Sequence, residues 1–263
     1  MLIHHLRNAT LVIESNNNYI LVDPMLGVKG SLPPFAYFRF KKQNNPLVEL
    51  PKKSSEILAK VTHILITHSH TFGLKALQHT DHLDTTGENF IKERNLPVCC
   101  GHHDQKYLTK QGFHVTSYVK HWETKEFLGG KITAIPAKHG HSWNHKMMAN
   151  GSGFVIELPN EPSLYISGDT VLTDDVKKAL IDFKPEVTVV ACGTAQVDLG
   201  PPILMTSLEI EEFVKLSPGK VICNHLEALN HCPTTRKTVR ELLDMKNPKE
   251  KYFIPNDGET LTF

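Results

Sequence analysis

Two short stretches that contain histidine and aspartate constrain this chain more than any other feature of its sequence. Residues 67–71 read Thr-His-Ser-His-Thr, and Asp81-His82 follows after the nine residues Phe72–Thr80. Without those nine residues the chain would contain His-x-His-x-Asp-His, a pattern typical of a dinuclear metal site. The fold must therefore bring the two stretches together if such a site is to form.

The interval can be placed in two ways, because His79-Thr80 repeats the pair His70-Thr71. Either His70 or His79 can be the histidine that precedes Thr-Asp-His. If the interval loops out, Asp81 and His82 return to their usual place, since the entropic cost of a loop grows slowly with its length. If it does not, the pair is displaced and one ion or none is bound. We favour the looped-out arrangement, with 72–80 as the insert.

Histidine or aspartate also follows each of four predicted apolar strands. These strands, with the residues that follow them, are Val61–Thr67 (His68, His70), Ile132–Ala137 (His139), Leu164–Ser167 (Asp169) and Val221–Cys223 (His225). Such strand ends can converge on one edge of a layered fold, where ligand sites form. His68 and His70 can face one ion, because residues i and i+2 of an extended segment point the same way.

Each of these residues alone has an ordinary structural explanation. Asp169 in Ser-Gly-Asp-Thr is a common turn residue, and a single histidine at a strand end is more often structural than a ligand. Their combination favours a metal site. Imidazole and carboxylate ligands suit zinc, manganese or iron(II), and the two oxygens of Asp169 can serve two ions.

The remaining pattern predicts a single mixed α and β domain over residues 1–263. Further strands are expected at Leu2–Leu6, Thr10–Glu14, Tyr19–Val22, Val98–Cys100, His114–Val119, Phe154–Leu158 and Val187–Ala191. Helices are expected at Glu88–Asn95, Asp104–Gln111, Thr173–Phe183, Ser207–Leu216 and Thr234–Met245. Residues 24–51, with five prolines, form either a lid or binding loop or a wrap over the core.

Composition narrows the class of protein. A net charge of +1 argues against broad electrostatic binding of nucleic acid, and no apolar stretch approaches the ~20 residues of a membrane span. Five cysteines without a Cys-x-x-Cys pair, and the lack of a basic, apolar leader, favour a reduced cytoplasmic protein.

The order of these pieces resembles the metallo-β-lactamase superfamily, and more narrowly its bacterial branch of ascorbate-6-phosphate lactonase-like hydrolases. The matching segments are Ala9–Glu14, Leu21–Leu26, Thr67–His70, Lys138–Gly140, Ser167–Thr170 and His225–His231. The resemblance implies an α/β fold in four layers, an αββα sandwich, with metal ions at one edge of the two sheets.

The resemblance also implies two divalent metal ions, zinc before manganese or iron(II). It places His68, His70 and His139 on the first ion and Asp81, His82 and His225 on the second, with Asp169 bridging them. A metal-activated water would then attack an ester-type bond, a lactone or a phosphoester, in a small molecule. Asp81 or Asp169 would orient that water and accept its proton.

A non-catalytic protein of the same fold is the alternative. In that case the 72–80 insert disrupts the dinuclear site, and the chain acts as a binding or regulatory module. Basic residues in the proline-rich segment suit either an anionic substrate or a solvated face: Lys29, Arg39, Lys41 and Lys42. No nucleic-acid partner is expected, and a homo-oligomer is compatible with the composition.

Overall fold

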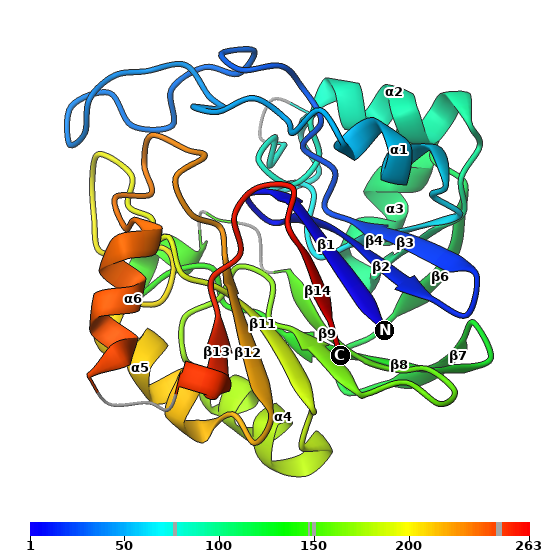
Figure 1. Ribbon diagram of the computed structural model, residues 1–263. Helices are drawn as coiled ribbons and strands as arrows, with labels where there is room; N and C mark the ends of the chain where they lie inside the picture. The colour runs from blue at the N-terminus through cyan, green and yellow to red at the C-terminus, as the bar shows by residue number, and fades with distance from the viewer. Residues whose placement is uncertain (76–77, 147, 149–150, 246–248) are drawn as a thin grey trace.

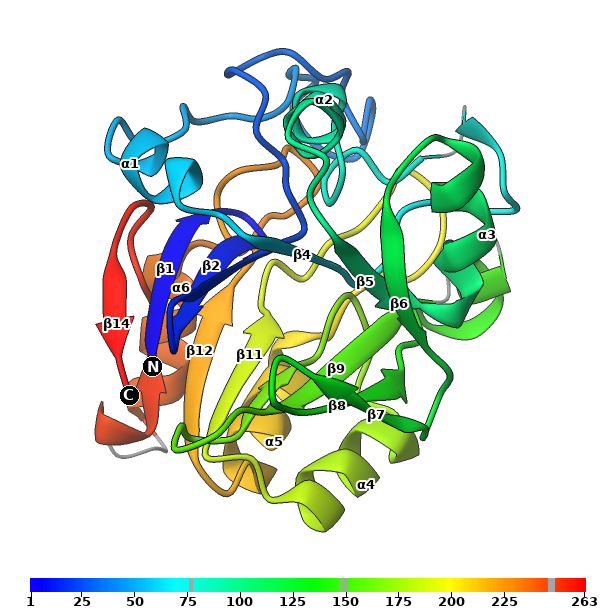
Figure 2. The same cartoon turned by 90° about the vertical axis from the view of Figure 1, so that its right-hand side faces the viewer.

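The computed structural model describes residues 1–263 except 76–77, 147, 149–150 and 246–248. In this part of the chain two seven-stranded sheets pack face to face, with helices on their outer faces (Figures 1 and 2). This layering confirms the αββα sandwich expected from the sequence.

The first sheet has the strand order β14-β1-β2-β3-β4-β5-β6. Its strands pair antiparallel from β14 to β3 and parallel from β3 to β6. Their bounds are β1 (Leu2–Arg7), β2 (Thr10–Ser15), β3 (Asn18–Val22), β4 (His63–Ile66), β5 (Val98–Gly101), β6 (Val115–Val119) and β14 (Thr260–Thr262).

The second sheet has the order β13-β12-β11-β10-β9-β8-β7. It is antiparallel from β7 to β10 and parallel from β10 to β13. Its strands are β7 (Thr124–Phe127), β8 (Gly130–Pro136), β9 (Ser152–Glu157), β10 (Leu164–Ile166), β11 (Val187–Ala191), β12 (Lys220–Asn224) and β13 (Tyr252–Phe253). Strands β8, β10 and β12 run in the same direction, so the residues that follow them emerge at one edge.

Helices α1 (Ser54–Ala59), α2 (Thr85–Glu93) and α3 (His102–Lys110) pack on the first sheet, and α4 (Asp174–Phe183), α5 (Ser207–Leu216) and α6 (Arg236–Asp244) pack on the second. Threonine side chains cap the second group. Thr206 and Glu209 form a capping box at the start of α5. Short 3₁₀ turns occupy Ser142–Lys146 (η2) and Lys249–Lys251 (η3). None of the helices in the described ranges combines the length and the apolar character that a membrane span needs.

One apolar core lies between the sheets. Ile13 and Leu65 of the first sheet and Phe154 and Val189 of the second belong to it. Strands β4 and β11 have almost uninterrupted apolar sequences, because each is covered on both of its faces.

The observed elements differ from the sequence prediction at short or polar segments. Strands β7, β13 and β14 and helix α1 were not predicted. Strand β7 is a short edge strand with the polar sequence Thr-Lys-Glu-Phe, which periodicity does not distinguish from a loop. Helix α2 begins at Thr85 and not at Glu88, because Asp84 caps it by accepting from the backbone N–H of Gly87 at 2.7 Å.

The proline-rich segment 24–51 has no helix or strand and is held down by buried polar groups. The guanidinium of Arg7 is fully buried and donates to the carbonyls of Met25 (2.8 Å), Gly27 (2.9 Å) and Val48 (3.0 Å). Asn230 accepts from the backbone N–H of Phe35 at 2.9 Å. The segment is therefore anchored to the core at several points, while residues 37–39 and 41–44 between them are exposed.

We expect Arg7→Met to destabilise the protein by about 3 kcal/mol or more, because three backbone carbonyls, those of Met25 and Gly27 fully buried, lose their donor. Arg94→Met is the matched control: Arg94 also donates to three backbone carbonyls, but it is exposed, so water can replace it. Urea unfolding measures both. If the free energy of unfolding fell equally in the two variants, the burial of Arg7 would not explain its contribution to stability.

Candidate metal centre

The residues between the two halves of the motif form a loop whose two ends are hydrogen-bonded to each other. His70 and Gln78 form an isolated antiparallel β-bridge. The backbone N–H of His79 donates to the carbonyl of Ser69 at 2.9 Å. The loop therefore consists of residues 70–78, and its closure places Ser69 beside His79.

His79 thus takes the place that the sequence analysis favoured for His70. Joined at Ser69 and His79, the chain has the uninterrupted order His-Ser-His-Thr-Asp-His. A looped-out insert agrees with this geometry, but its limits are 70–78 and not 72–80. The expectation that His70 faces the first ion does not agree with it.

His70 lies instead against helix α3. Its ring stacks on Tyr107, with centroids 4.0 Å apart, and its Nδ1 lies 3.3 Å from Asp104 Oδ1. Asp104 also accepts from the backbone N–H of Ser69 at 2.8 Å. These contacts hold the first limb of the loop on α3 and occupy the His70 side chain.

The second limb is held by a buried carboxylate of helix α2. Glu88 accepts from Gln78 Nε2 at 2.6 Å and pairs with Lys75. Tyr107 donates to Gln78 Oε1 at 3.0 Å. Because both ends of the loop are fixed by side chains outside it, His79 is delivered to a defined position.

Three histidines form the first candidate ligand group: His68, His79 and His139. Each offers a ring nitrogen within 4.8 Å of the others. The ring centroids of His68 and His79 are 4.7 Å apart. They come from the end of β4, the end of the loop and the end of β8. Three neutral imidazoles are a ligand set that zinc uses when it keeps a position open for water.

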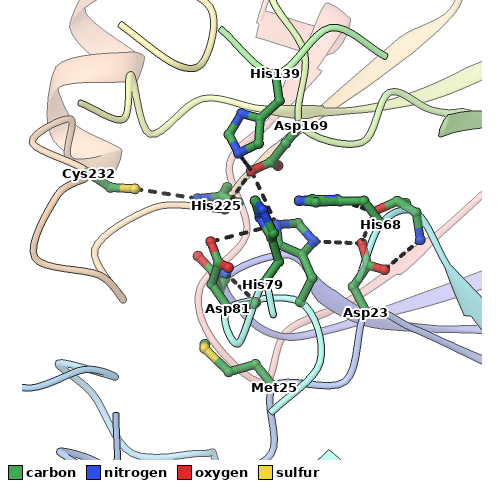
Figure 3. A network of polar contacts seen from close by, with 12 residues as sticks. Asp23, Met25, His68, His79, Asp81, His139, Asp169, His225 and Cys232 are labelled. Atoms are coloured by element: carbon green, nitrogen blue, oxygen red, sulfur yellow. Dashed lines mark hydrogen bonds and ion pairs between the residues drawn. The ribbon is translucent and has the colours of Figure 1, made fainter. Parts of the chain in front are cut away.

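A second group lies beside the first and consists of Asp81, His82, Asp169 and His225, all of them buried. Asp169 Oδ2 is 3.2 Å from His82 Nε2 and 3.5 Å from His225 Nε2. The same oxygen is 3.7 Å from His139 Nε2 of the first group. Asp169 therefore lies between the two groups, as Figure 3 shows. This is the position that a bridging carboxylate requires.

Unusual backbone conformations help to aim these side chains. Gly168 has φ +62°, and a Cβ added there would lie 3.1 Å from the carbonyl oxygen of Ser152. The positive φ therefore favours glycine before Asp169, and a Cβ there would also press on the backbone of Ser152. His225 itself has φ +60°, a conformation that costs free energy and persists where the surroundings fix it.

Asp23 links the two groups from behind. Its Oδ2 lies 2.9 Å from His82 Nδ1. Its carboxylate also accepts from the backbone N–H of Thr67 at 2.8 Å and from Thr67 Oγ1 at 2.6 Å. Thr67 directly precedes His68, so one buried carboxylate orients residues on both sides of the loop. A carboxylate behind a ligating histidine fixes its tautomer and ring orientation.

Two further groups orient the remaining histidines. His139 Nδ1 lies 2.8 Å from the carbonyl oxygen of Ile203, and His225 Nδ1 lies 3.5 Å from Cys232 Sγ. The sequence alone did not identify Asp23, Ile203 or Cys232 as parts of the site. Of these three, only Asp23 lies in a segment that matches the family pattern, Leu21-Val22-Asp23-Pro24, and that match is weak by itself.

The charges of the site suit a cation. Burial, reinforced by nearby His82, lowers the pKa of His68 well below its usual value, and burial lowers the pKa of His79 to about 3. Burial also acts to lower the pKa of His82, but Asp169 and Asp23 outweigh it and raise that pKa well above the usual value. Burial acts to raise the pKa of Asp169, but the surrounding histidines, His82 first, outweigh it and hold that pKa well below its usual value. Neutral imidazole and ionised carboxylate are the forms that bind metal, so His68, His79 and Asp169 are ready to bind an ion, whereas His82 must release its proton when an ion binds.

Buried atoms without partners provide the test of fit. Among the described residues, His68 Nε2, His225 Nε2 and Asp169 Oδ1 are buried and make no hydrogen bond. Such atoms are costly in a protein interior unless something satisfies them. Because they belong to the two ligand groups, divalent cations fit the site.

A cavity of about 440 Å³ lies over the site. His79, Asp81 and His139 form part of its wall. The other lining residues are Pro33, Pro34, Phe35, Thr71, Gln78, Thr80, Met148, Val197, Ile203 and His231. The proline-rich segment therefore supplies part of the wall, in addition to covering the core. No lysine or arginine of the described residues lines this cavity.

His231 also lines the cavity. Its ring packs edge-on against Phe35, with centroids 5.2 Å apart. Burial lowers its pKa to about 4, so the ring is neutral at physiological pH. A neutral imidazole in this position adds an uncharged polar group to the wall, beside Thr71, Gln78 and Thr80.

Comparisons with known proteins agree with this architecture. The Beta-lactamase superfamily domain matches residues 18–225. The UPF0173 protein YddR of Bacillus subtilis is 32% identical over 266 residues, covering 100% of both chains. A possible metal-dependent hydrolase from Veillonella parvula has a TM-score of 0.87 at 31% identity, covering 100% of this chain and 99% of that one. An isothiocyanate hydrolase from Delia radicum gut bacteria has a TM-score of 0.86 at 29% identity, with the same coverage.

Replacing His79 by alanine is expected to lower bound metal by about one ion per chain, since one ligand group loses a donor. His70→Ala is the control and is expected to retain the metal of the unchanged protein. Elemental analysis after reconstitution with zinc measures both. Loss of metal in His70→Ala, with none in His79→Ala, would reverse the assignment.

Proposed function

Because this chain belongs to the beta-lactamase superfamily and is a metal-dependent hydrolase, we propose that it hydrolyses a small, uncharged substrate at an electrophilic carbon. The wall of the cavity over the metal centre carries this proposal. The apolar part of that wall is formed by Pro33, Pro34, Phe35, Met148, Val197 and Ile203, and none of the described lining residues is a lysine or an arginine. An apolar wall favours burial of an apolar substrate body.

The ligand groups described above would hold two divalent ions. His68, His79 and His139 would bind the first, and Asp81, His82 and His225 the second, with Asp169 shared. Zinc suits this donor set best, and manganese or iron(II) are alternatives. When bound, the ions supply a water of lowered pKa and polarise the electrophile.

The protein's own groups would position the water and manage its proton. Asp81 lines the cavity and belongs to the second ligand group, which places its carboxylate at the boundary between substrate and metals. Asp169 lies deeper, between the groups. We assign to these two carboxylates the orientation of the attacking water and the acceptance of its proton.

Among ester-type bonds, the cavity favours a lactone or another carboxylic ester over a phosphoester. A phosphoester is anionic and is usually held by arginine or lysine. The basic residues expected to attract an anion, Lys29, Arg39, Lys41 and Lys42, are not among the residues that line the cavity. The proposal therefore departs from the anionic substrate suggested by the sequence.

An isothiocyanate is the second candidate. Its central carbon is electrophilic, and the molecule is small, uncharged and largely apolar, as the cavity requires. The isothiocyanate hydrolase from Delia radicum gut bacteria, similar over the whole chain, favours this candidate.

A substrate panel distinguishes these reactions. We expect zinc-reconstituted protein to hydrolyse a γ-lactone or benzyl isothiocyanate with a kcat/KM about a hundredfold or more above that for bis(p-nitrophenyl) phosphate, because the cavity offers the anion no cationic side chain. His70→Asn should keep this activity, and metal-depleted protein should lose it. A preference for the phosphodiester would contradict the proposal.

A further inference from the structure

A second cluster of histidines lies outside the dinuclear centre. His102 and His103 begin helix α3, directly after β5, and His121 follows strand β6. The three residues each offer a ring nitrogen within 4.8 Å of the others. The ring centroids of His102 and His103 are 3.7 Å apart, and His121 lies 5.1 and 5.2 Å from them. Two neighbouring strands of the first sheet thus bring three imidazoles together.

The three rings differ in how they are held. His121 Nε2 lies 3.2 Å from Ser152 Oγ, a contact that fixes this half-buried ring. His102 Nδ1 is buried and makes no hydrogen bond to the described residues. His103 is exposed, so its ring is free to adjust. A fixed ring, an unsatisfied nitrogen and an adjustable ring together suit the capture of an ion.

We propose that His102, His103 and His121 bind a third divalent transition-metal ion, of the zinc class, separate from the dinuclear centre. Imidazole is a ligand for zinc, copper and nickel. Nitrogens bound to one tetrahedral zinc lie about 3.4 Å apart, from Zn–N bonds of about 2.0–2.1 Å. The three nitrogens lie within 4.8 Å of one another, so modest movements of the rings, for which the exposed His103 has room, bring them to that spacing.

The electrostatic environment allows such an ion. Burial and the neighbouring His103 lower the pKa of His102, and burial with both other histidines lowers the pKa of His121 to about 4. The N-terminus of α3 and the positive charge of Lys120 both disfavour a cation here. The negative charges of Asp104 and Glu123 near His102, and of Asp175 near His121, favour one.

The proposed site opens onto a cavity of about 590 Å³. His103, His121, Asp104, Asp175 and His145 are among the residues that line it. Three protein ligands leave one position of a tetrahedral ion for water or an external ligand. The cavity gives such a ligand access from solvent.

Equilibrium dialysis of metal-depleted protein against zinc tests the proposal. At increasing free zinc, the unchanged protein should bind one equivalent more than His103→Asn or His121→Asn. His114→Asn removes an exposed histidine outside the cluster and should retain that equivalent. In the unchanged protein, the zinc that binds last should also shift an imidazole ¹⁵N resonance of His103. That resonance is identified by its absence from the spectrum of His103→Asn.

Equal zinc uptake by the unchanged protein and both cluster variants would overturn the proposal. Loss of the equivalent in His114→Asn as well would overturn it too, because it would indicate general surface binding. His103 is exposed, so its replacement should leave folding intact, and circular dichroism checks this. The dialysis also counts the two zinc ions of the dinuclear centre in every variant. A missing dinuclear centre is therefore distinguished from a missing third ion.

Discussion

The hydrogen bond from the backbone N–H of His79 to the carbonyl of Ser69 is the contact on which the metal centre depends. It closes the loop 70–78 and restores the order His-Ser-His-Thr-Asp-His in space. The neighbouring His70–Gln78 bridge supports it, and helices α2 and α3 hold both limbs. Without this closure Asp81 and His82 would follow His70 at a distance, and neither ligand group would be complete.

Asp23 connects this closure to the rest of the fold. It lies at the end of β3 and contacts Thr67 at the end of β4 and His82 beyond the loop. The second sheet supplies the other half of the site, because β8, β10 and β12 end at the same edge. The two ligand groups therefore form where the two sheets meet at one edge, and the closed loop brings His79, Asp81 and His82 to that edge.

The mixed α and β character of the chain could be predicted from local patterns in the sequence, whereas the αββα layering was expected only from the resemblance to the metallo-β-lactamase superfamily. An apolar strand that ends in histidine or aspartate is visible without knowledge of its neighbours, as with His139, Asp169 and His225. The choice between His70 and His79 was not visible. It depends on pairing across nine residues and on Tyr107 and Asp104, which lie far along the chain. The carbonyl of Ile203 carries no sequence signal at all.

Anomalous diffraction at the zinc edge, from crystals of zinc-reconstituted protein, tests the central claim most directly. We predict two neighbouring peaks, one between His68, His79 and His139 and one between Asp81, His82 and His225, with Asp169 contacting both. A peak coordinated by His70 in place of His79 would contradict this account. So would the absence of any peak beside Asp169.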